Sequence, residues 1–192
     1  MDLSIAYALY FASRGSGFAT TGTAKQATPY TTTARVLLSG LGADELFAGY
    51  TRHATAFNRN GYEGLLNELE LDVNRLGKRN LGRDDRVISH WGREARFPYL
   101  DESFVNWTLS LPVWEKCDFG ASNKPDEFVE IEPGKKVLRL LAHRLGLVSV
   151  AQEKKRAVGV SLPHTVSWLT SSRFNLGQGQ QKWRPAEPKG RQ

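Results

Sequence analysis

Two adjacent carboxylates, Asp44 and Glu45, follow a turn with two glycines, and this group is the clearest candidate for chemistry in the chain. Residues 36–45 read Val-Leu-Leu-Ser-Gly-Leu-Gly-Ala-Asp-Glu. The apolar residues at the start of this segment predict a buried parallel strand, and Gly40 and Gly42 allow backbone N–H groups to approach a ligand closely. Because the carboxylates begin a helix and compete there with a bare phosphate, a metal-bound phosphate or an amine fits this position better. The pattern therefore predicts a nucleotide-binding loop.

The remaining nucleophiles and metal ligands form no recognisable site pattern. The four histidines have no spacing that would place two ligands on one helix turn, so the sequence does not indicate a zinc site. No Gly-x-Ser-x-Gly string occurs, which argues against a serine hydrolase. Cys117 is the only cysteine, which excludes internal disulfides and thiolate metal clusters and indicates a reducing compartment.

The charge and hydropathy of the chain limit its partners. No apolar stretch is long enough to cross a bilayer and the first residues lack the features of a secretory signal, so we expect a cytoplasmic protein without a membrane partner. Much of the net charge of +6 comes from basic residues within 75–83 and 182–191. Aromatic residues do not alternate with these basic residues, so the basic segments predict a solvated surface and not a nucleic-acid site.

Helical spacing of apolar residues predicts a helix-rich chain that holds the loop in place. The expected helices lie within residues 4–14, 44–58, 65–76, 84–91, 101–111 and 135–145. Asn60-Gly61 is a turn signal between the second and third of them, and Asp101 is well placed to cap the fifth. The apolar stripes within 65–76 and 135–145 predict packed helix faces. Residues 15–33 are expected to be a long connection.

The expected domain organisation is one domain over residues 1–158 and a largely disordered tail over residues 159–192. The tail combines scattered apolar residues with clustered glycine, glutamine, proline and lysine. Such a composition does not favour a packed core.

Two motifs carry a resemblance to a known enzyme family. Residues 39–45 follow the pattern Ser-Gly-x-Gly-x-Asp-Glu, and residues 92–101 follow Gly-x-Glu-Ala-Arg-x-Pro-x-Leu-Asp. With both motifs in this order, residues 2–158 resemble the synthetase domain of glutamine-hydrolysing asparagine synthetases. The resemblance implies an α/β fold, the C-terminal portion of the adenine nucleotide alpha-hydrolase (ATP pyrophosphatase, PP-loop) fold. It also implies asparagine biosynthesis, in which ATP with Mg²⁺ adenylates the side-chain carboxylate of aspartate and ammonia then displaces AMP.

The resemblance implies roles for individual residues as well. Ser39 and Gly40 correspond to positions that contact the nucleotide, and Gly42 lies in the same loop, so we expect all three to bind the cofactor. Asp44 corresponds to an acidic residue near the substrate and the metal, and we expect it to be catalytic and to bind Mg²⁺. Lys155 corresponds to the lysine that binds pyrophosphate, where its charge neutralises the leaving group.

The sequence departs from the family pattern in three places. The phosphate-loop string Ser-Gly-Gly-x-Asp-Ser is absent from the 192 residues, and Cys117 is not the N-terminal nucleophile that a glutaminase domain requires. Leu41 stands where the family has a catalytic glutamate, and leucine cannot transfer a proton or orient an amine. We therefore expect a fragment, which is an incomplete and catalytically impaired version of the enzyme.

Two other interpretations stay open. A non-catalytic remnant would act as a binding or interaction module, and it would associate through apolar surface that an incomplete sheet leaves exposed. A tRNA-modifying relative of the same fold would be consistent with the positive net charge of the chain, although the match over residues 92–101 argues against it.

Overall fold

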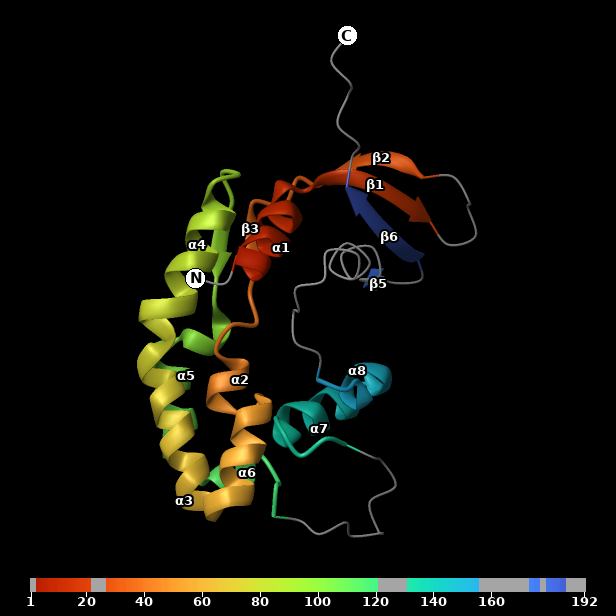
Figure 1. Ribbon diagram of the computed structural model, residues 1–192. Helices are drawn as coiled ribbons and strands as arrows, with labels where there is room; N and C mark the ends of the chain where they lie inside the picture. Colours follow the sequence, from red (N-terminus) through yellow and green to blue (C-terminus); the bar gives the residue numbers. More distant parts are fainter. Residues whose placement is uncertain (1–2, 22–26, 121–130, 156–172, 177–178, 186–192) are drawn as a thin grey trace. The chain divides into compact units, whose positions relative to one another are not determined.

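The computed structural model describes residues 3–21, 27–120, 131–155, 173–176 and 179–185 (Figure 1). Within these ranges the chain is helix-rich and also contains short strands, as the sequence predicted. It divides into two compact units: the first lies within residues 1–37, 82–96 and 156–192, and the second within 38–81 and 97–155. The predicted domain boundary after residue 158 lies outside the described residues and stays a prediction.

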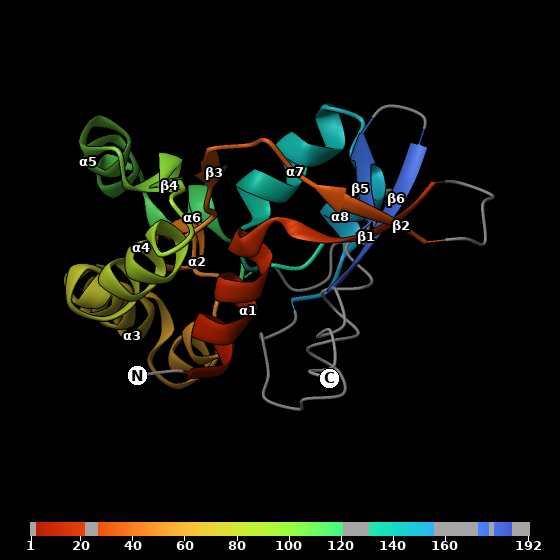
Figure 2. The ribbon, with the colours of Figure 1, turned by 90° about the horizontal axis from the view of Figure 1, so that it is seen from above.

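The first unit contains two packed helices and a four-stranded antiparallel sheet. Helix α1 (Leu3–Arg14) packs against α4 (Gly82–Ser89), and the ring of Tyr10 lies 5.0 Å from that of Trp91. The sheet has the order β2-β1-β6-β5, and Figure 2 shows its strands side by side. The bounds are β1 Ser16–Thr21, β2 Thr28–Thr31, β5 Arg173–Leu176 and β6 Gly179–Pro185.

Two parts of this sheet lie where the sequence predicted no regular structure. Strands β1 and β2 form an antiparallel pair within residues 15–33, which we expected to be a connection. Strands β5 and β6 lie within the predicted tail, whose other residues are outside the described ranges. These strands are short and lack clear apolar alternation, so hydrogen bonds to neighbouring strands define them, and a single sequence does not reveal such pairings.

Strand β3 (Val36–Leu38) pairs with β4 (Glu94–Arg96) in a separate two-stranded sheet. The prediction of a buried strand at residues 36–38 is wrong, because 42% of Val36 and 75% of Leu38 are exposed. Within the described residues this sheet has only two strands, so no layer of helices on both faces covers β3. The three apolar residues correctly indicated a strand, but they did not reveal its surroundings.

The second unit is built from helices. They are α2 (Ala43–Leu46), α3 (Thr51–Leu76), the π-helical turn Gly77–Leu81, the 3-10 turn Pro98–Leu100, α5 (Glu102–Ser110), α6 (Val113–Lys116), α7 (Lys136–Arg144) and α8 (Val148–Gln152). The predicted N-cap is confirmed, since Asp101 accepts hydrogen bonds from the backbone N–H groups of Ser103 and Phe104. No helix in the described ranges has the length and apolar character needed to cross a bilayer.

The helices near the glycine-rich loop differ from the prediction in one respect. A continuous helix over residues 44–58 is wrong, because Ala48 has a φ of 57°, a left-handed backbone conformation that ends α2. The predicted break at Asn60-Gly61 is confirmed, since Gly61 has φ 60° and ψ −149° in the middle of α3. The chain thus makes a tight turn between α2 and α3, directly after the two carboxylates.

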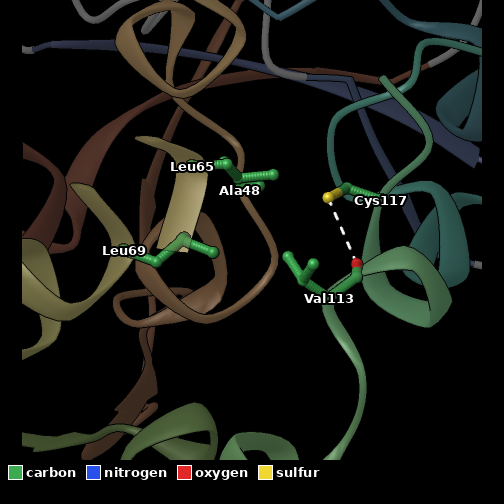
Figure 3. Packing of buried hydrophobic residues seen from close by; sticks show 5 residues of the cluster. All are labelled: Ala48, Leu65, Leu69, Val113 and Cys117. Carbon is green, nitrogen blue, oxygen red and sulfur yellow. Dashed lines mark hydrogen bonds between the residues drawn. The ribbon is translucent and has the colours of Figure 1, made fainter. Parts of the chain in front are cut away.

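The core of the second unit gathers around α3 (Figure 3). The cluster consists of Ala48, Leu65, Leu69, Val113 and Cys117. The prediction that the stripe within 65–76 is core is confirmed by the burial of Leu65 and Leu69. The Cys117 thiol donates to the Val113 carbonyl at 3.4 Å, and burial raises its pKa to about 11, so it is protonated at neutral pH.

The apolar face of α7 is less packed than its sequence pattern predicts. More than half of Leu141 and of Leu145 is exposed, whereas Arg139 on the same helix is buried. On α1, Leu3, Tyr7 and Phe11 are also exposed. Association through exposed apolar surface therefore stays a prediction, and these residues of α1 and α7 are the ones that we expect to take part in it.

Candidate functional site

The glycine-rich loop at residues 39–44 is held by hydrogen bonds within the loop. The Ser39 hydroxyl accepts a hydrogen bond from the Leu41 N–H at 3.2 Å, and the Gly40 carbonyl accepts from the Ala43 N–H at 3.2 Å, where α2 begins. A Cβ atom at Gly40 would have no atom within 4 Å, so this backbone faces open space. A ligand can therefore approach the loop at Gly40.

Gly42 has a different reason to be glycine. Its φ is 101°, which disfavours any residue with a side chain, and a Cβ atom there would lie 2.5 Å from Leu100 Cδ2. The backbone conformation and the close packing against Tyr99 and Leu100 therefore already favour glycine at this position. Cofactor binding by Ser39, Gly40 and Gly42 stays a prediction, and the open space at Gly40 favours that residue most.

Asp44 is the centre of the site because two lysines pair with its carboxylate. Lys155 Nζ donates to Asp44 Oδ2, and Lys135 Nζ lies 2.7 Å from Oδ1. All three side chains are mostly buried. Burial alone would raise the pKa of Asp44, but hydrogen bonds and charge from the two lysines lower it below its ordinary value. The carboxylate is therefore ionised at neutral pH, and the three groups together carry one net positive charge.

Lys135 is a residue of this site that the sequence did not single out. Its backbone is left-handed, with φ 57°, and its N–H donates to the Phe47 carbonyl at 2.9 Å. Ala48, with the same φ, directly follows Phe47, and no other non-glycine residue in the described ranges has a positive φ. Left-handed backbone costs energy for residues with a Cβ and often occurs at functional sites. The backbone hydrogen bond between Lys135 and Phe47 therefore holds the start of α7 and the α2–α3 connection together next to the Asp44 carboxylate.

Lys155 is positioned by a buried arginine of α7. Arg139 Nη1 donates to the carbonyls of Ala151 and Glu153, at 2.8 and 2.7 Å. Its Nη2 lies 3.1 Å from Glu132 Oε2, and the same oxygen accepts the backbone N–H of Lys155 at 3.0 Å. The segment that carries Lys155 is thus attached to α7 through one guanidinium and one carboxylate.

Glu45 is paired separately and does not take part in the lysine cluster. Its side chain is buried, and its Oε1 accepts hydrogen bonds from the Tyr50 hydroxyl at 2.6 Å and from Asn80 Nδ2 at 3.4 Å. Burial, together with the neighbouring Glu45 carboxylate, raises the pKa of Tyr50 above its ordinary value, so the hydroxyl stays protonated and donates. Among the residues that the structure describes, Asp44 contacts cationic side chains and Glu45 does not.

A second polar cluster lies at the start of α3. The Tyr50 N–H donates to His53 Nδ1 at 3.3 Å, which leaves the proton on Nε2 to be donated to Asp72 Oδ2 at 2.9 Å. Arg52 Nη2 also contacts Asp72 Oδ2, at 2.5 Å. Burial lowers the pKa of His53 even though Asp72 opposes the shift, so this imidazole is neutral.

The burial of His53 predicts a pH dependence of stability. In the unfolded chain His53 takes up a proton below its ordinary pKa of 6.5, whereas in the folded chain it stays neutral until the pH falls further. The unfolded state therefore binds more protons just below pH 6.5, and the free energy of unfolding falls by up to about 1 kcal/mol over the first pH unit below 6.5. Urea unfolding at several pH values over this range gives the free energy of unfolding as a function of pH. We expect this dependence on pH to be weaker in His53→Gln and unchanged in His90→Gln, the control at an exposed site. An unchanged dependence on pH in His53→Gln would contradict this assignment.

The arrangement around Asp44 does not fit a bare magnesium ion. Two ammonium groups already contact its oxygens, and their charge opposes a divalent cation. In the described part of the chain, no three His, Cys, Asp or Glu side chains gather to hold a metal. The cluster fits an anion better, because a ligand with negative oxygens can share the lysines with Asp44. Magnesium binding by Asp44 stays a prediction from the resemblance.

Sequence reasoning identified Asp44 and Lys155 and missed Lys135, Arg139 and Tyr50. The structure brings the first two together although they are 111 positions apart. Lys135 and Arg139 belong to a predicted amphipathic helix, where basic residues are usually solvated. A signal did exist in the sequence: Arg139 is the only charged residue among apolar neighbours at 137–138 and 140–142.

Comparison with known proteins gives consistent matches. The profile described as asparagine synthase matches residues 15–68 and 58–175. The asparagine synthetase domain-containing protein 1 of Bos taurus is 48% identical over 158 residues, which are 82% of this chain and 23% of that protein. The human protein of the same name is 44% identical over the same shares. The glutamine-hydrolysing asparagine synthetase of Sandersonia aurantiaca is 37% identical over 93 residues, 47% of this chain and 17% of that enzyme. The chain therefore spans about a quarter or less of the length of these relatives.

Proposed function

Because the chain belongs to the asparagine synthase family, as its two motifs predicted, we propose that its second unit supplies part of a site for ATP-dependent amidation of a carboxylate. The proposed substrate is aspartate, with ammonia as the amine. ATP, when bound, supplies the adenylate that activates the carboxylate. The proposed fold of the complete domain is the PP-loop type, of which this chain supplies the C-terminal portion, and the proposed location is the cytosol.

The convergence of Lys135 and Lys155 on Asp44 is the observation that carries this proposal. Two ammonium groups next to each other can hold the oxygens of pyrophosphate and neutralise its charge as it leaves. Asp44 would keep both lysines in place until the anion arrives. Gly40, whose backbone faces open space, would contact the nucleotide together with Ser39.

Two observations favour a second candidate, a binding module without catalysis. Leu41 occupies the position where the family pattern has a catalytic glutamate, and its side chain offers no group that could move a proton. The string of the phosphate loop is also absent from these 192 residues. On this second interpretation the anion site would be retained while the chemistry is lost.

Titration of inorganic pyrophosphate, and separately of ATP, into the purified chain tests the shared anion site. Lys155→Ala is expected to weaken pyrophosphate binding by about tenfold to a hundredfold, since a charge-assisted hydrogen bond typically contributes about 1.5–3 kcal/mol. The matched control is Lys154→Ala, because Lys154 is exposed and adjacent in sequence. Calorimetry gives the dissociation constants directly.

Three outcomes are informative. Equal losses of pyrophosphate affinity in Lys155→Ala and Lys154→Ala would mean that pyrophosphate binds to a diffuse basic surface, and would refute the anion site. Binding of pyrophosphate without any turnover of aspartate and ammonia, even in a longer protein that includes the phosphate loop, would favour the non-catalytic module. Amide formation by that longer protein would support the ligase.

A further inference from the structure

We propose that Tyr50 is a positioning residue whose ring holds the Lys155 ammonium at the anion site, independently of Asp44. The Lys155 ammonium lies over the Tyr50 ring, 5.1 Å from its centroid. An ammonium over an aromatic face is attracted by the negative charge density of the ring. This inference rests on the proposed anion site and adds a residue to it.

The Tyr50 ring is a rigid support because it is fixed at several points. Its hydroxyl donates to the buried Glu45, and its backbone N–H donates to the buried His53. The Arg52 guanidinium also lies over the ring, 4.1 Å from the centroid, and is itself paired with Asp72. A tyrosine held at both ends and on its face has little freedom to move.

Lys155 needs such a support. A lysine side chain has four rotatable bonds and samples many rotamers when nothing restrains it. In the structure it is restrained by the Asp44 carboxylate and by the Tyr50 ring. An incoming anion competes with Asp44 for the ammonium, but it does not compete for an aromatic face. The ring can therefore keep Lys155 in position while its hydrogen-bond partner changes.

Two variants of Tyr50 separate the hydroxyl from the ring. Tyr50→Phe keeps the aromatic face over Lys155 and removes the hydrogen bond to Glu45. Tyr50→Leu removes both. If the ring positions Lys155, the two variants will differ in the Lys155 NMR signal and in pyrophosphate affinity, and this difference measures the contribution of the ring. A purely structural role through Glu45 would affect both variants alike.

The first measurement is the NMR signal of the Lys155 side chain, in protein grown with isotope-labelled lysine and assigned with Lys155→Arg. The ε-methylene protons of Lys155 are expected upfield of those of Lys154 in wild type and in Tyr50→Phe, because ring currents shield protons above an aromatic face. In Tyr50→Leu they are expected to move to the position of Lys154. The signals of the other lysines report whether each variant is folded.

The second measurement is pyrophosphate affinity. Tyr50→Phe is expected to stay within about twofold of wild type, and Tyr50→Leu to bind about threefold to tenfold more weakly. Equal affinities for Phe and Leu, or an unchanged Lys155 signal in Tyr50→Leu, would overturn the positioning role. A shift pattern as expected, without pyrophosphate binding in any variant, would instead refute the proposed anion site while leaving the contact between ring and lysine established.

Discussion

Replacing Arg139 with methionine is expected to lower the free energy of unfolding by about 3 kcal/mol and to release Lys155 from Asp44. Methionine retains most of the apolar volume, so the loss comes from the guanidinium. That group donates to the carbonyls of Gly134, Ala151 and Glu153 and pairs with Glu132. Without it, one buried and two partly buried carbonyl groups lose their donor, and the segment that carries Lys155 loses its attachment to α7.

Urea unfolding measures the stability effect, and the Lys155 ε-methylene signal measures the release. Arg144→Met is the matched control because Arg144 is an exposed residue on the same helix, and we expect its effect to stay within about 0.5 kcal/mol. Arg139→Lys is expected to be only a partial rescue, since an ammonium cannot reproduce the fork of the guanidinium. A stable Arg139→Met variant with an unchanged Lys155 signal would show that Arg139 does not position the lysine.

Replacing Gly49 with alanine is expected to lower the free energy of unfolding by about 2–3 kcal/mol and to displace the Asp44 side chain. A Cβ atom at residue 49 would lie 1.9 Å from Asp44 Oδ1 and 2.9 Å from Asp44 Cα. Rotation of the carboxylate relieves only the first contact, because the second involves backbone. The turn between α2 and α3 must therefore open, and the pairing of Asp44 with both lysines is lost with it.

Gly77→Ala is the control for this substitution. Gly77 has φ −63° and ψ −31°, and a Cβ atom there would have no atom within 4 Å. Alanine at this position is expected to be neutral or slightly stabilising, since it reduces the freedom of the unfolded chain. Thermal unfolding of both variants, with pyrophosphate affinity for each, checks the prediction. Gly49→Ala with wild-type stability and affinity would mean that the turn is more adaptable than the structure indicates.

Much of the local structure was predictable because its causes lie close together in sequence. The cap at Asp101 and the break at Gly61 depend on a few neighbouring residues, and both are confirmed. The continuous helix over 44–58 failed for a tertiary reason. The α2–α3 turn is tied to α7, since the Phe47 carbonyl accepts the N–H of Lys135, and that partner is far away in the chain.

The candidate site also has some residues that could be recognised from local sequence and others that depend on tertiary contacts. Asp44 was identifiable because a glycine-rich loop precedes it, and Lys155 because it matches a position in the resembling family. Nothing near Tyr50 in the sequence indicates that its ring meets a lysine more than one hundred positions later, and the basic pattern of α7 does not show that Arg139 is buried. Those contacts depend on how the chain folds back on itself.

The amino-acid sequence by itself determined the family, the position of the glycine-rich loop, the helix-rich character and the strand at residues 36–38, because motifs, caps and apolar periodicity are local properties. Only the tertiary structure decided that β3 is exposed and that Lys135 and Lys155 share one carboxylate. It also decided that a buried arginine and a fixed tyrosine hold the second lysine. The physical reason is that burial and charge pairing depend on contacts between distant segments, and residue type alone does not specify them.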